Sequence, residues 1–290
     1  MNLLITGASG GLGRRLIPSL LARENIKIRT LAHRSQVKFP DCETVAGALE
    51  DFDSLVAATE GIDAVLHLAA LTHSPNEADY FKINGEGTKN LIAACRRNKI
   101  RRFIFMSSGA AHPEGGAYSE SKLAAEAIVK QSGLPWLILR PREVYGTEGK
   151  EGINQLMTWV RKFPVIPVIG DGRYSLNPVF IDDVVTATVE SVFQTGVVGK
   201  TFALAGTEEI AYAALIDRLA GFFGVRVWKL FIPIPLLKWM VLLLNGLNIK
   251  TLVPDQIPRL LCDKSSRGDP EIPLLNFKPR NLEAGLQKLK

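Results

Sequence analysis

The sequence predicts an α/β fold in which a doubly wound parallel sheet is followed by a small C-terminal lobe. Through residue 146, short apolar runs alternate with stretches of helical hydrophobic spacing, a pattern typical of right-handed βαβ crossovers. The first apolar run ends in a glycine-rich turn, and most prolines come later in the chain. We therefore predict a nucleotide-binding domain at 1–146 and 177–206, and a substrate-binding lobe at 147–176 and 207–290.

The expected elements follow one another in regular order. Strands are predicted where short β-branched or aliphatic runs stand between turn residues, and helices where apolar residues recur every three or four positions. The first strand, NLLIT, leads through glycines into a helix that carries Leu12, Leu16 and Leu20 on one face. Further strands are expected at 26–33, 45–51, 63–70, 101–108, 135–140 and 200–206, and further helices at 51–61, 84–98, 119–133 and 177–193.

Composition indicates a soluble globular protein in a reducing compartment. With 47% hydrophobic residues among 290, the chain is able to bury a large core. The opening MNLLIT has neither the basic region nor the long apolar run of a secretory signal, so we expect a cytoplasmic protein. Cys42, Cys95 and Cys262 form no C-x-x-C pair, which argues against a disulfide framework or a zinc site. No metal is expected.

Two unusual segments bear on which partners the protein could bind. The densest basic run, residues 95–103, suits a helix C-terminus, where the backbone dipole attracts cations, and lacks the interleaved aromatic residues that stack bases. We therefore expect no nucleic-acid partner. Residues 230–249 are nearly as long as a membrane span, but Pro233, Pro235 and Lys238 interrupt them. A buried helix or a partner surface is favoured, and contact with a membrane surface is left open.

The glycine turn predicts a dinucleotide site. Gly7, Gly10 and Gly13 follow a strand and open a helix, so unpaired backbone N–H groups and the positive helix end would cradle a pyrophosphate. The second strand ends in LAHRSQ, with His33 and Arg34 and no acidic residue to bind a ribose 2′-hydroxyl. This favours NADP over NAD.

Tyr118 and Lys122 stand four residues apart in AYSESKLAAE, so they share one face of the predicted helix. A tyrosine has a reference pKa near 10 and needs a neighbouring cation to act as a base at neutral pH. Lys122 is interpreted as that cation. The alternative is an exposed tyrosine beside a solvated lysine.

Six segments of the sequence resemble segments of a known protein family, and they occur in the same order as in that family. They are TGASGGLG, LHLAA, NGEGTKNLIAAC, FMSSGA, YSESK and LRPREVYG. Together they resemble the extended short-chain dehydrogenase/reductase superfamily, which includes NAD-dependent epimerases and dehydratases acting on nucleotide sugars. The later segments GDGRYSLNPVFIDDVV and LLNFKPRNLEAGL extend the resemblance over nearly the whole chain.

The resemblance implies an NAD(P)-dependent enzyme that transfers hydride at a secondary alcohol or ketone. Tyr118 would be its general base or acid, Ser108 would polarise the substrate oxygen, and Lys122 would also bind the nicotinamide ribose. The cofactor contacts that it implies, together with those read from the glycine turn, are Gly7, Ser9, Gly10, Gly11, Leu12, Gly13, His33, Arg34, Leu49, Leu68, Ala69, Ala70, Asn84, Ser107, Tyr118, Lys122, Pro141 and Val144.

The substrate is left among several classes. A nucleotide-sugar epimerase or a ketoreductase is favoured. Gly109 and Ala110 stand where related dehydratases carry an Asp-Glu pair, which disfavours dehydration, and Leu176 aligns where sugar epimerases set an arginine on the substrate pyrophosphate. The alternatives are a reductase of small or lipid-like ketones and a non-catalytic NADPH-binding subunit of a membrane complex. A homodimer is left open.

Overall fold

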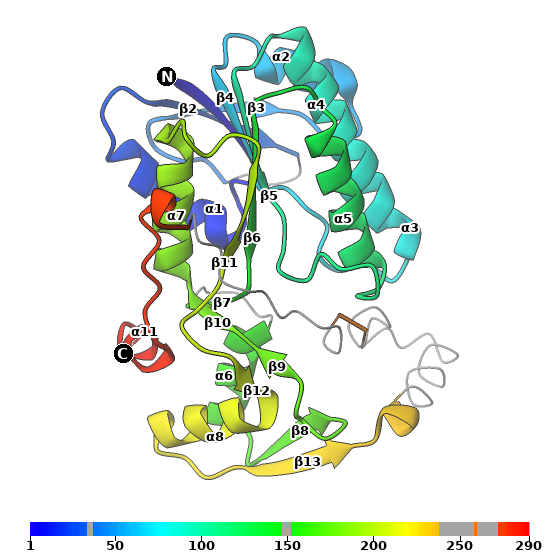
Figure 1. Cartoon of the computed structure of the whole chain (residues 1–290), viewed down its shortest axis with the longest axis vertical. Coiled ribbons are helices and arrows are strands. Elements are labelled where there is room, and N and C mark those ends of the chain that lie inside the picture. The colour runs from blue at the N-terminus through cyan, green and yellow to red at the C-terminus, as the bar shows by residue number, and fades with distance from the viewer. Residues whose placement is uncertain (34–36, 147–151, 238–257, 260–271, 290) are drawn as a thin grey trace.

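A seven-stranded parallel sheet forms the centre of the protein (Figure 1). The computed structural model describes residues 1–33, 37–146, 152–237, 258–259 and 272–289. The strand order is β11-β6-β5-β4-β1-β2-β3, which is the order of a dinucleotide-binding sheet with its reversal between β1 and β4. The strands are β1 (Asn2–Thr6), β2 (Lys27–Ala32), β3 (Cys42–Ala46), β4 (Ala64–His67), β5 (Arg102–Met106), β6 (Trp136–Pro141) and β11 (Lys200–Leu204).

Helices cover both faces of this sheet, as predicted. Figure 1 shows α1 (Gly11–Leu21) and α7 (Ile181–Phe193) on one side, and α2 (Phe52–Thr59), α4 (Gly87–Arg97) and α5 (Ala117–Lys130) on the other. Alternate residues of β1 accordingly enter two different hydrophobic clusters, Leu3 and Ile5 in one and Leu4 in the other. Burial on both faces explains why these strands read as continuous apolar runs.

Two predicted boundaries were wrong. The third strand was expected at 45–51 but occupies Cys42–Ala46, because CETVA pairs in register with β2. The helix expected at 84–98 belongs to a longer helical segment that starts with α3 (Glu77–Tyr80), passes through a π-helical turn, η1 (Phe81–Glu86), and becomes α4. A π-turn is rare and frequently marks a functional site, and this one contains Asn84.

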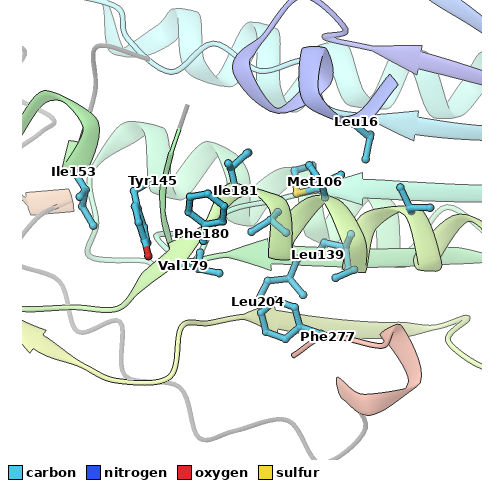
Figure 2. Packing of buried hydrophobic residues seen from close by; sticks show 14 of the residues in the cluster. Leu16, Met106, Leu139, Tyr145, Ile153, Val179, Phe180, Ile181, Leu204 and Phe277 are labelled. Carbon is cyan, nitrogen blue, oxygen red and sulfur yellow. The ribbon is translucent and has the colours of Figure 1, made fainter. Parts of the chain in front are cut away.

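The second half of the chain adds small elements below the C-terminal edge of the sheet in Figure 1. Figure 2 shows how one core joins them to it: the rings of Tyr145 and Phe180 meet edge to face at 5.4 Å, and Phe277 lies beside Leu204 of β11. Because this cluster is continuous, the predicted division into domains stays a prediction. The added elements are β7 (Glu143–Tyr145), α6 (Gly152–Lys162), β8 (Val165–Ile169), β9 (Ser175–Leu176), β10 (Pro178–Phe180), β12 (Ile210–Ala211), α8 (Tyr212–Phe223), β13 (Trp228–Ile232), η2 (Ile272–Leu275) and α11 (Leu282–Gln287).

The segment 230–249 is described only as far as residue 237. Its first three residues are not in a buried helix but in β13, where WKLFI pairs in parallel with VIPVI of β8 and leaves Leu230 and Phe231 exposed. Residues 238–249 lie outside the described residues, so a membrane or partner surface there stays a prediction. Among the helices in the described part of the chain, none is both long enough and apolar enough to cross a membrane.

Candidate active site

The glycine turn lies tightly against the ends of β1 and β4. Gly7 has a φ of 73°, which L side chains rarely adopt, and a Cβ there would lie 2.5 Å from the backbone nitrogen of Ala69. A Cβ on Gly13 would lie 2.4 Å from the carbonyl oxygen of Ala8. These two glycines therefore allow the turn to fold closely over the strand ends, and neither tolerates a side chain.

The N-terminus of α1 has the properties of an anion site. Its N-cap is Gly10, which has no side chain to cap the first N–H groups, and its first turn carries Arg14 and no acidic residue. The Arg14 guanidinium donates to the carbonyl oxygen of Ser9 at 2.9 Å, so its charge stays beside the turn. Exposed backbone N–H groups, the helix dipole and this charge fit a dinucleotide pyrophosphate.

A cleft of about 600 Å³ opens beside this turn. It brings together the predicted cofactor residues Gly7, Ser9, His33, Leu49, Ala69 and Ala70. Sequence reasoning missed other lining residues, because they reach the cleft from separate elements; among these are Thr30, Phe39, Glu50, Lys82 and Ile83. The cleft fits the nucleotide end of a dinucleotide. Arg34, predicted to bind a 2′-phosphate, lies outside the described residues.

Asn84 joins three parts of the site. Its side-chain oxygen accepts from the backbone N–H of Leu71 at 2.8 Å, and its amide nitrogen donates to the Leu71 carbonyl and to the hydroxyl of Ser121. It therefore fixes the loop after β4 against α5. The cofactor contacts predicted for Asn84, and those for Leu68, Pro141 and Val144 at the strand ends, stay predictions.

A buried series of hydrogen bonds connects Asn84 to Thr6 of β1. The hydroxyl of Thr88 donates to the Asn84 carbonyl at 2.6 Å, which leaves its oxygen to accept from His67 Nε2 at 3.0 Å. His67 Nδ1 then accepts from the hydroxyl of Thr6 at 2.6 Å. Burial, and secondarily the positive charge of Lys122, lower the pKa of His67 to about 3. The imidazole is therefore neutral and structural at physiological pH.

Tyr118 and Lys122 share one buried face of α5, with exposed fractions of 5% and 2%. The Lys122 ammonium donates to the carbonyl oxygen of Met106 at 2.8 Å and lies 4.2 Å from the ring centroid of Phe105. Burial lowers the pKa of Lys122 to about 7, although the charge of Glu126 acts in the opposite direction. The predicted alternative, an exposed tyrosine beside a solvated lysine, is therefore wrong, because both side chains are buried.

The surroundings of Tyr118 differ from those of the chain's structural tyrosines. Burial raises the pKa of Tyr145, and raises that of Tyr212 to about 12. Tyr118 stands one helical turn before Lys122 in α5, and its ring meets the edge of Tyr80 at 5.9 Å and 76°. The proton-transfer role of Tyr118 stays a prediction.

The two serines at the end of β5 have different partners. Ser107 is buried and donates to Oε1 of Glu126 at 2.6 Å, and Glu126 also accepts two bonds of 2.6 Å from Arg140. The hydroxyl oxygen of Ser108 accepts from the backbone N–H of Ala110 at 3.1 Å, which keeps its proton for another acceptor. This supports Ser108 as the serine that meets a substrate oxygen, while the cofactor contact of Ser107 stays a prediction. The Glu126 and Arg140 pair was missed, although Glu126 follows Lys122 by one helical turn.

Leu176 lies in the core rather than in a polar subsite. It is 5% exposed, in β9, and belongs to the cluster that continues into the central sheet. Arg173, three residues before it in the sequence, has a side chain that is 88% exposed and lies 3.8 Å from Asp171. Neither residue supplies a buried guanidinium for a pyrophosphate.

The chain matches known proteins over most of its length. A family model described as the NAD dependent epimerase/dehydratase family matches residues 3–205. A solved structure of a Bacillus cereus UDP-glucuronic acid 4-epimerase, in complex with UDP-glucuronic acid and NAD, has a TM-score of 0.80 at 21% identity and covers 99% of this chain and 97% of its own. At that identity the likeness shows a shared fold.

Two curated relatives are reductases. A 4-hydroxy-2-methyl-3-oxo-4-farnesyl-3,4-dihydroquinoline-1-oxide ketoreductase from Stigmatella aurantiaca is 28% identical over 186 residues, which are 56% of this chain and 55% of the relative. This chain therefore spans about half the length of that ketoreductase. A 2-alkyl-3-oxoalkanoate reductase from Stenotrophomonas maltophilia is 26% identical over 252 residues, 77% of this chain and 76% of the relative.

Proposed function

Because this chain belongs to the NAD-dependent epimerase/dehydratase family, we propose that it transfers hydride between a nicotinamide dinucleotide and the carbon of a secondary alcohol or ketone. The observation that carries the proposal is the buried placement of Tyr118 and Lys122 on one face of α5. The glycine turn and the adjoining cleft support a dinucleotide as the cofactor.

A bound nicotinamide would supply the hydride for a ketone or accept it from an alcohol. In the reductive direction, the Tyr118 phenol gives its proton to the carbonyl oxygen as the carbonyl carbon gains hydride. The Lys122 ammonium, held by the Met106 carbonyl, stabilises the tyrosinate that remains. The hydroxyl of Ser108 donates to the same substrate oxygen and orients it. In the oxidative direction, Tyr118 removes the hydroxyl proton.

We further propose a preference for NADP over NAD. The support is the end of β2, where Leu31 and Ala32 lead to His33 at the edge of the cleft with no carboxylate in that strand end to accept from a ribose 2′-hydroxyl. Calorimetric titration of the purified protein with NADPH and with NADH tests this preference. A lower Kd for NADPH than for NADH is expected, and an equal or higher one would reject the preference.

For the substrate, a ketoreductase is our first candidate. Leu176 packs in the core, where a sugar epimerase would need a guanidinium, and two of the curated relatives are named as reductases of oxo compounds. A nucleotide-sugar epimerase is the second candidate, and the fold shared with a UDP-glucuronic acid 4-epimerase favours it.

One experiment separates these candidates. Purified protein is given a panel of alkyl ketones with NADPH or NADH, and in parallel a panel of UDP-hexoses without added cofactor. We expect net oxidation of the reduced nicotinamide by a ketone. Interconversion of a UDP-hexose with its 4-epimer would favour the epimerase. No reaction in either panel would contradict the proposed enzyme and support the non-catalytic alternative.

A further inference from the structure

The two-stranded sheet of β8 and β13 has one face that is apolar along its whole length. Successive side chains of a strand point to opposite faces of a sheet. One face of this pair meets the rest of the protein, since Ile166 and Val168 are buried in the core and Lys229 bonds to Asp217 of α8. The other, called here the β8–β13 face, consists of residues paired in register: Val165 with Trp228, Pro167 with Leu230, and Ile169 with Ile232.

The β8–β13 face is exposed to solvent. Trp228 has an exposed fraction of 79%, and Val165, Pro167 and Leu230 are exposed as well. The solvated face of a sheet normally carries polar residues, and an exposed apolar patch of this kind marks an interaction surface. Nearly half of the exposed large apolar side chains in the described part of the chain belong to these strands or to residues beside them: Phe163, Val165, Trp228, Leu230, Phe231 and Leu236.

Positive charge lies at the end of this face where both strands begin. The backbone N–H of Trp228 donates to the carbonyl oxygen of Pro164 at 2.7 Å, so the residues that lead into the two strands lie close together. Lys162, in the last turn of α6, and Arg226 are among them, and both are exposed. An exposed apolar surface with cations beside it is typical of proteins that bind to an anionic membrane surface.

We propose that the β8–β13 face docks the protein on the surface of a bilayer that contains anionic phospholipids. The segments that carry this face, 159–170 and 221–237, include four basic residues and no acidic one. The net charge of +6 acts in the same direction. The Trp228 side chain suits the boundary between headgroups and acyl chains, because it joins a large apolar ring system to one N–H donor. In Figure 1, β8 and β13 lie at the opposite end of the molecule from α2.

A second copy of this chain is a less favourable occupant, because the face is small. Two paired strands of five residues cover about 16 Å by about 10 Å, whereas each partner in a stable dimer buries about 800 Å². Docking on a bilayer does not require an interface of that size. Its strength increases with each apolar side chain that enters the lipid and with each cation near the surface.

The test is flotation of the purified chain with lipid vesicles. One set of vesicles contains equal parts of phosphatidylcholine and phosphatidylglycerol, and the other contains phosphatidylcholine alone. The wild type should bind the anionic vesicles more tightly. Trp228→Ser should lower binding to them about tenfold or more, the effect of withholding one large apolar side chain from lipid. Phe52→Ser is the matched control, since Phe52 is an exposed aromatic residue of α2, and it should bind as the wild type does.

The contribution of charge is measured with two double variants. Lys162→Gln with Arg226→Gln should lower binding to the anionic vesicles about 25-fold, at about fivefold for each cation near the surface. Arg96→Gln with Arg97→Gln removes the same charge from the last turn of α4 and should change binding less than about twofold. Equal losses in the two double variants would overturn the inference, because attraction by net charge alone would then explain the binding.

Two other results would also overturn it. One is a wild type that floats with neither kind of vesicle, and the other is a Trp228→Ser protein that binds as tightly as the wild type. Light scattering on the same samples identifies the competing occupant: a wild-type dimer that becomes a monomer in Trp228→Ser, without flotation, would assign the face to a second copy. Because Trp228 is exposed, thermal melts without vesicles should give this variant the Tm of the wild type. The ketone and UDP-hexose panels decide on the proposed function separately.

Discussion

Gly10 and Gly13 both belong to the glycine turn, but the structure predicts opposite consequences for their replacement. A Cβ on Gly10 meets one atom at 3.3 Å, the carbonyl oxygen of Gly7, and the residue is exposed with φ and ψ of −70° and 166°. A β-branched residue adopts this conformation without strain. In Gly10→Val the added carbons therefore point to the place proposed for the pyrophosphate, and the fold itself should survive.

The expected effect can be worked out as a free energy. At a dinucleotide concentration one hundredfold above Kd, binding adds about 2.7 kcal/mol to the wild-type free energy of unfolding. This raises Tm by roughly 5–10 °C, at about 2–4 °C per kcal/mol for a chain of this size. If the valine weakens binding a thousandfold, the gain falls to about 0.1 kcal/mol. Loss of the glycine N-cap should cost the apo protein about 1 kcal/mol or less.

The assay is a thermal melt of each protein with and without NADPH and NADH. Gly13→Ala is the contrast, because its Cβ would lie 2.4 Å from the carbonyl oxygen of Ala8, and crowding of this kind costs about 1–3 kcal/mol in the apo protein. A Gly10→Val protein whose Tm rises with dinucleotide as much as that of the wild type would refute the pyrophosphate site.

Three further predictions concern stability and cofactor choice. Burial holds the pKa of His67 at about 3 in the folded protein, below the reference value near 6.5, so unfolding takes up a proton between pH 6.5 and pH 3. The free energy of unfolding should therefore fall by up to about 4 kcal/mol as pH drops from 6.5 toward 3. In urea melts at several pH values, His67→Gln should make this dependence on pH weaker. Glu126→Gln should lower the free energy of unfolding by about 2–3 kcal/mol in urea melts, because it leaves Arg140 without its buried charged partner. The control Glu86→Gln, which removes an exposed ion pair with Lys89, should lower it by less than about 0.5 kcal/mol. Equal losses of stability in the two variants would contradict this prediction. Arg34→Ala should weaken NADPH binding by about 1.5–3 kcal/mol and leave NADH binding unchanged in calorimetry, and equal effects on both would remove the 2′-phosphate interpretation.

The sequence was sufficient for features set by local chemistry. The alternation of apolar strands and helices predicted the parallel sheet, and the spacing of Tyr118 and Lys122 predicted their common face on α5. The basic run also ends a helix as expected, since Arg96 and Arg97 occupy the last turn of α4. Hydrophobic periodicity and the charge of side chains at a helix end depend only on neighbours within one element, so the sequence predicts them.

Features that depend on contacts between distant parts of the chain could not be predicted from the sequence. The third strand was misplaced because its bounds depend on register with β2 rather than on its own weakly apolar residues. Nothing in the local pattern places the Arg259 guanidinium over the Tyr118 ring, or Lys82 at the cleft beside the glycine turn, because these contacts form only when separate elements come together. The start of the 230–249 segment reads as helix by its apolar content, yet pairs as a strand with β8.

The most direct test of the central claim measures proton and hydride transfer at Tyr118. A single turnover of the ketone used by the wild type is followed as loss of reduced nicotinamide in Tyr118→Phe, with the Kd of the dinucleotide measured on the same samples. Removal of the phenol proton should slow hydride transfer by about 10²- to 10⁴-fold, while the dinucleotide Kd stays within about twofold of the wild type. A variant that transfers hydride within about tenfold of the wild-type rate would contradict the account.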